Sequence, residues 1–73
     1  MPHITISMYP GRTDEVKQQM AKNAKESFVE LNSVPEGSVS VSIEEIEPSD
    51  FSDEIKKRLN EKNTLVETSD YVK

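Results

Sequence analysis

Pro2, which directly follows Met1, is the residue best placed to take part in catalysis. Methionine is commonly removed when the next residue is small, and its removal here would expose a secondary amine. An ordinary α-amino group titrates at about 7.7–8.0, and desolvation or a nearby cation lowers that pKa. Since the proline ring fixes the nitrogen relative to the backbone that follows, the amine would be a well-placed general base. The alternative interpretation is a proline that only opens an edge strand.

Arg12 is the second candidate, because it lies in a Pro-Gly turn and its planar guanidinium suits a carboxylate held by two parallel hydrogen bonds. A solvated turn arginine is the alternative. His3 adjoins Pro2, and we interpret it as a structural or surface residue rather than a proton shuttle.

The composition excludes several other kinds of chemistry. With one histidine and no cysteine, a single chain cannot build a Cys/His nucleophile pair or a histidine-rich metal site, so we expect no metal. The chain has only two glycines, and neither begins a phosphate-binding loop.

A strand and a long helix must position these residues. Ile4, Ile6 and Met8 alternate with polar residues, which predicts a strand with one face in a core, and Pro10-Gly11 ends it. Thr13 is a plausible N-cap for a helix that runs to about Asn32. Its apolar stripe is predicted to be Val16, Met20, Ala24, Phe28 and Leu31, with Lys17, Lys22, Lys25 and Glu30 on the opposite face.

A second strand is predicted over residues 38–43, where serines alternate with β-branched residues. Two strands separated by a long helix imply a parallel pair joined by a right-handed crossover. The predicted fold is therefore a single βαβ unit of the α/β class, or α+β by some schemes. Because an isolated two-stranded sheet is marginal in water, we expect dimerisation to complete it.

The remainder of the chain predicts smaller elements. Ser49 or Ser52 could begin a short helix in which Phe51, Ile55 and Leu59 share a face. The segment 64–67 could form a short strand. We find no linker, and we expect residues 1–73 to form one domain.

Length and charge indicate the partners. A chain of 73 residues that is one-third hydrophobic has a thin core, which favours self-association. The net charge of −5 and the few aromatic residues argue against nucleic acid. No stretch has membrane-spanning length and no leader is evident, so we expect a cytoplasmic protein with no membrane partner.

The sequence resembles the 4-oxalocrotonate tautomerase family, whose subunits are βαβ chains of this size. The resemblance runs through Pro2 with Ile4 and Ile6, Gly11-Arg12, the helix opening at residues 13–15, Val34-Pro35, the strand 39–43, Glu45 and Phe51. It implies the tautomerase (MIF-like) fold and an amino-terminal proline that moves a proton in an enol or dienol acid, a role that falls on Pro2. It also implies that Arg12 holds the substrate carboxylate and that Phe51 forms an apolar wall of the pocket. The Met-Pro-His-Ile opening and the C-terminal extension look most like the phenylenolpyruvate tautomerase branch.

One departure from the family affects the expected substrate. Ser40 stands where the name-giving enzymes carry a second arginine, which polarises the substrate carbonyl from a neighbouring subunit. A neutral hydroxyl stabilises a developing enolate less well than a guanidinium, so a mono-acid with an aryl or small apolar group fits better than oxalocrotonate.

The resemblance thus implies a cofactor-free keto-enol tautomerase, an isomerase of the intramolecular oxidoreductase type. Its substrate would be a 2-keto or enol carboxylic acid. We expect a homodimer, with a hexamer as the alternative. Two other functions stay open: a non-catalytic binding or assembly protein on the same fold, and hydration or dehalogenation by the same proline.

Overall fold

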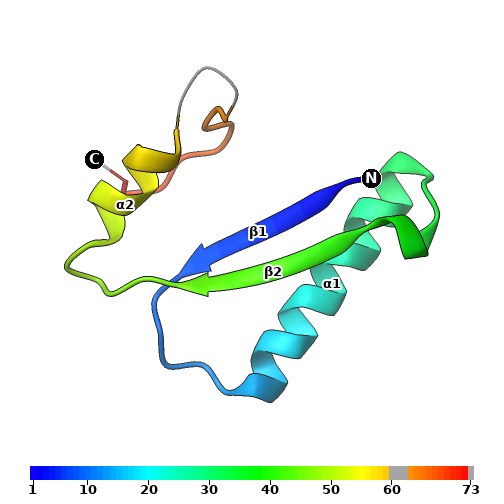
Figure 1. Cartoon of the computed structure of the whole chain (residues 1–73), viewed down its shortest axis with the longest axis horizontal. Helices are drawn as coiled ribbons and strands as arrows, with labels where there is room; N and C mark the ends of the chain where they lie inside the picture. Colours follow the sequence, from blue (N-terminus) through cyan, green and yellow to red (C-terminus); the bar gives the residue numbers. More distant parts are fainter. Residues whose placement is uncertain (60–62, 73) are drawn as a thin grey trace. The chain divides into compact units, whose positions relative to one another are not determined.

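A computed structural model describes residues 1–59 and 63–72, with the element order β1, α1, η1, β2 and α2 (Figure 1). The chain divides into two compact units, one of residues 1–6 and 11–44 and the other of residues 7–10 and 45–73. That residues 1–73 form a single domain stays a prediction.

The sheet has two strands, β1 (His3–Met8) and β2 (Ser40–Glu45). The Ser40 N–H donates to the Pro2 carbonyl at 3.2 Å and the Ile46 N–H donates to the Met8 carbonyl at 2.8 Å. Both pairs have the same offset in residue number, and both numbers increase together, as a parallel ladder requires. The predicted βαβ unit with parallel strands is confirmed.

The start of the second strand differs from the prediction by two residues. Ser38 belongs to the short 3-10 helix η1 (Glu36–Ser38) and its hydroxyl donates to the Pro35 carbonyl at 2.7 Å. This local hydrogen bond holds the backbone in a turn, which alternation of side-chain polarity does not detect.

Helix α1 (Asp14–Asn32) has the ends that its sequence predicts. The Thr13 hydroxyl accepts from the Val16 N–H at 3.2 Å, and Asp14 lies in the first turn, where negative charge suits the helix dipole. At the other end Ser33 adopts a left-handed conformation with φ 53°, and its N–H donates to the Val29 carbonyl. Pro35 follows two residues later.

The predicted apolar stripe of α1 is only partly correct. Met20, Ala24 and Phe28 are half-buried, whereas Leu31 is 81% exposed and Val16 is also exposed. The half-buried face instead continues through Lys17, Ala21, Lys25 and Val29. The prediction that Lys17 and Lys25 lie on the solvent face is wrong, because the aliphatic stem of a lysine covers apolar surface while its ammonium reaches solvent.

The buried core is small. Among the described residues only three hydrophobic side chains are buried: Met8, Val39 and Ile46. No residue of α1 is fully buried. The polar face of the sheet carries His3, Ser40 and Ser42, all exposed. A core this thin agrees with the expectation drawn from length and composition.

In the second unit, α2 (Phe51–Arg58) begins after Asp50, whose side chain makes no capping hydrogen bond. The predicted starts at Ser49 and Ser52 are wrong, since Ser52 already lies in the first helical turn. Residues 64–67 form no strand, so that prediction is also wrong. No helix in the described part of the chain is long and apolar enough to cross a membrane.

Candidate functional site

Pro2 lies immediately before β1 and is half-buried, while the preceding Met1 is fully exposed. The hydrogen bond from the Ser40 N–H to the Pro2 carbonyl extends the β ladder to this residue. The Pro2 backbone is therefore held by the sheet, and the peptide bond to Met1 projects into solvent. If Met1 were removed, the new amine would stand at a fixed point beside the start of β2.

His3 is held by the serines of β2. Its Nδ1 is hydrogen-bonded to the Ser40 hydroxyl at 2.6 Å and its Nε2 to the Ser42 hydroxyl at 3.0 Å. The Ser42 hydroxyl also lies 3.4 Å from the hydroxyl of Thr5. Both ring nitrogens are thus engaged, and the interpretation of His3 as a structural or surface residue stays a prediction. The bond to Ser40 was missed, because it depends on the strand register.

Arg12 is exposed and makes no hydrogen bond or ion pair with the other described residues. It follows Gly11, whose φ of 122° is a conformation that a residue with a Cβ rarely adopts. This turn lies in the connection between β1 and the N-cap of α1. The guanidinium is thus free to bind an anion.

The structure does not bring Pro2 and Arg12 together within one chain. Pro2 precedes the six-residue strand β1, and Arg12 follows it. Six residues of strand span roughly 20 Å at about 3.3 Å per residue. Figure 1 shows the N-terminus at one end of β1 and the connection to α1 at the other. The two candidate residues therefore flank opposite ends of the strand.

Phe51 belongs to the second unit, where it begins α2. Its ring packs edge-to-face on Tyr9 with 5.1 Å between centroids, and Tyr9 packs in the same way on Tyr71 at 6.1 Å. These are three of the four aromatic residues of the chain. Sequence reasoning missed Tyr9 and Tyr71, because no periodic pattern links them to Phe51. The three rings form an apolar aromatic surface.

The described residues contain no group of three or more His, Cys, Asp or Glu side chains that could hold a metal ion. With Met1 removed, Pro2 would supply an amine held by the sheet, and Arg12 supplies a guanidinium that has no partner among the described residues. Such a pair can move a proton and bind a carboxylate.

Comparisons with known proteins agree with these features. A family model described as Tautomerase enzyme matches residues 2–52, a stretch that starts at Pro2 and includes Arg12 and Phe51. The chain is 34% identical to a probable tautomerase of Bacillus cereus and to one of Bacillus anthracis, over 52 residues that cover 71% of this chain and 85% of each relative. It is 33% identical to a 2-hydroxymuconate tautomerase of Bacillus subtilis, over 71% of this chain and 84% of the relative.

A solved structure of a tautomerase homologue is also similar to this chain. The crystal structure of YwhB, described as a homologue of 4-oxalocrotonate tautomerase, is similar with a TM-score of 0.62 and 34% sequence identity. The similarity covers 64% of this chain and 77% of that one.

Proposed function

This chain belongs to the tautomerase family, and from that premise we propose that it is a keto-enol tautomerase with the Pro2 amine as its general base. The observation that supports the proposal best is the position of Pro2, which the Ser40 N–H ties to the sheet behind an exposed Met1. Removal of Met1 creates the base without any movement of the strand.

The proposed reaction is an isomerisation that needs no cofactor. In the ketonisation direction, the unprotonated Pro2 nitrogen accepts the proton of the enol hydroxyl as the carbonyl forms. The protonated Pro2 nitrogen then delivers that proton to the neighbouring carbon, which regenerates the unprotonated amine, so the reaction consumes no oxidant or reductant. An amine with a pKa near neutral serves in both steps, because it gains and loses its proton at similar cost.

The proposed substrate is a 2-keto or enol monocarboxylic acid with an aryl or apolar group. Arg12 supports this assignment because its guanidinium has no partner within residues 1–59 and 63–72, and Phe51 supports it through its aromatic contact with Tyr9. Ser40 offers a neutral hydroxyl that is already hydrogen-bonded to His3, in the position where a guanidinium would stabilise a second anionic group. A phenylenolpyruvate-type acid fits these residues.

We propose that the active site is shared between two copies in a cytoplasmic homodimer. β1 is one of the two edge strands of the sheet and so has a free edge. If two copies pair their β1 strands in antiparallel fashion, the start of one strand meets the end of the other. Pro2 of one copy then lies near the Arg12 turn of the second copy, which removes the separation found within one chain.

The test compares Met1-cleaved protein, verified by intact mass, with a form that retains Met1. Loss of the enol absorbance of phenylenolpyruvate measures turnover. We expect the retained methionine to lower kcat by about 10²–10⁴-fold, since the secondary amine is then part of a peptide bond. Pro2→Ala in the cleaved form replaces the secondary amine by a primary amine, so it should shift the pH–rate profile. Undiminished turnover with Met1 in place, or identical pH profiles, would show that Pro2 is not the base.

A further inference from the structure

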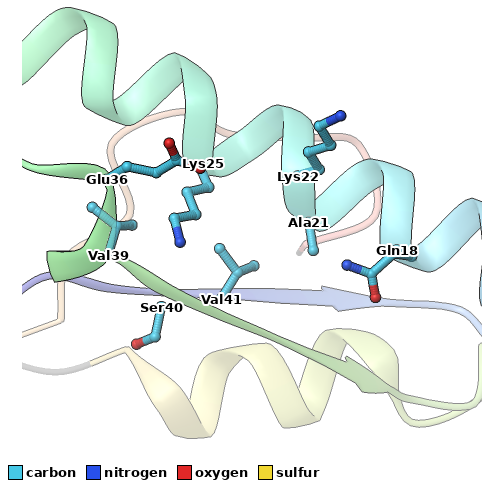
Figure 2. Close-up of a pocket in the computed structure, with 8 residues that line it drawn as sticks. All are labelled: Gln18, Ala21, Lys22, Lys25, Glu36, Val39, Ser40 and Val41. Atoms are coloured by element: carbon cyan, nitrogen blue, oxygen red, sulfur yellow. The ribbon is translucent and has the colours of Figure 1, made fainter.

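A groove of about 390 Å³ lies between α1 and β2 (Figure 2). Ser40, whose N–H donates to the Pro2 carbonyl, is among its lining residues. One wall is formed by α1 through Gln18, Ala21 and Lys25. The floor is formed by β2 through Val41 and by Val39, which directly precedes the strand. We call it the Lys25 groove. Its volume is within the range of small-molecule sites.

Lys25 gives this groove a positive charge. Its side chain is half-buried, and Figure 2 shows its Nζ pointing between Val39 and Val41. Among the described residues Lys25 makes no ion pair or hydrogen bond. Lys22 also lines the groove, but it is exposed and its Nζ lies 4.0 Å from Oε1 of Glu26. A half-buried lysine side chain whose ammonium has no counter-ion among the described residues favours an anion beside that ammonium.

The free edge of β2 adds a backbone donor to the same place. Ser40 directs its N–H towards β1, as its bond to Pro2 shows. Because alternate residues of a strand direct their backbone groups to opposite sides, Val41 directs its N–H away from β1, towards the open edge. Val41 also lines the groove. An ammonium and a backbone N–H together suit the two oxygens of a carboxylate.

An adjoining hollow shows where the anion would not bind. This hollow, of about 340 Å³, shares Gln18, Ala21 and Val41 with the Lys25 groove. Its cation is Lys17, which already pairs with Asp14 at 3.4 Å. Positive charge without a carboxylate partner is therefore found at the Lys25 end, while apolar surface continues along Ala21 and Val41.

We propose that the Lys25 groove binds a small organic monocarboxylate, with the carboxylate at Lys25 and the Val41 N–H and the apolar part over Ala21 and Val41. Glu36 lines the groove without pairing with Lys25 and opposes this binding. This site does not depend on the proposed catalysis by Pro2. It gives the chain a second place for the class of acid that Arg12 would hold.

The experiment is a titration of ¹⁵N-labelled protein with 3-phenylpropionate, which has no enol form and cannot react. We expect a saturable shift of the Val41 amide signal. Lys25→Met, which keeps the apolar stem, should raise Kd by about tenfold or more, and Lys25→Arg should restore binding. Glu36→Gln should tighten it. Lys57→Met is the matched control, because Lys57 is 75% exposed on α2 and pairs with Glu54.

Two results with the variants, and one with a neutral ligand, would overturn the proposal. One is an unchanged Kd in Lys25→Met. The other is loss of the Val41 shift in Arg12→Met, which would show that the acid binds at Arg12 instead. The neutral amide of the same acid should produce no comparable shift; equal shifts would mean apolar contact without carboxylate recognition. If phenylenolpyruvate is not turned over but the Lys25-dependent shifts are present, only the proposed function fails.

Discussion

At the scale of single residues, Arg12 is the side chain whose surroundings best suit it to bind a ligand. Its guanidinium is exposed and has no partner among the described residues. We expect Arg12→Ala to raise KM for phenylenolpyruvate by about tenfold or more, because a charge-assisted bidentate contact with the carboxylate is lost. Arg12→Lys keeps the charge but loses the planar guanidinium, so its KM should lie between those of the wild type and Arg12→Ala. Steady-state kinetics measure this effect, and an unchanged KM in Arg12→Ala would exclude carboxylate binding by Arg12.

Some residue roles were visible in the sequence and others were not. The N-cap role of Thr13 was predictable, because it depends on residues that are adjacent in the chain. The bond between His3 and Ser40 joins residues 37 positions apart and depends on strand register, which alternation alone leaves open. The half-buried position of Lys25 depends on how α1 is rotated over the sheet. A stripe of apolar residues gives that rotation only roughly, since a lysine stem can replace an apolar neighbour.

At the scale of elements, the N-cap of α1 makes a contribution to stability that can be measured by itself. The Thr13 hydroxyl satisfies the Val16 N–H, one of the donors that a helix leaves unpaired in its first turn. We expect Thr13→Ala to lower the free energy of unfolding by about 1 kcal/mol, whereas Thr13→Ser keeps the acceptor and should change it little. Urea unfolding followed by circular dichroism measures the difference at one fixed protein concentration. Equal losses in both variants would mean that the methyl group, and not the cap, stabilises the helix.

Elements also differ in how well their sequence predicts them. α1 was predictable over its whole length because capping residues, periodicity and a following proline agree. The 3-10 turn at Glu36–Ser38 and the absence of a strand at residues 64–67 were not predictable. Short segments carry too few residues for a pattern, so a single side-chain hydrogen bond such as that of Ser38 decides the conformation.

At the scale of the whole molecule, the small core and the separation of Pro2 from Arg12 lead to the same expectation. Three buried hydrophobic residues among those described are few for a 73-residue chain. β1 and β2 each leave a free edge, which is a template for pairing with another strand. A second copy that pairs with β1 would bury apolar surface and would also complete the proposed site.

Mixing two impaired variants, assayed at a substrate concentration well below KM, tests this arrangement directly. If each site takes Pro2 from one copy and Arg12 from the other, Pro2→Ala and Arg12→Ala homodimers are both impaired at each of their sites. After the two are unfolded together and refolded in equal amounts, half of the dimers are mixed. Each mixed dimer has one site with both residues intact and one with neither, so we expect about one quarter of the wild-type activity. Each variant refolded alone is the control. Activity no greater than the average of the two controls would mean that Pro2 and Arg12 act from the same chain, and the shared active site would have to be abandoned.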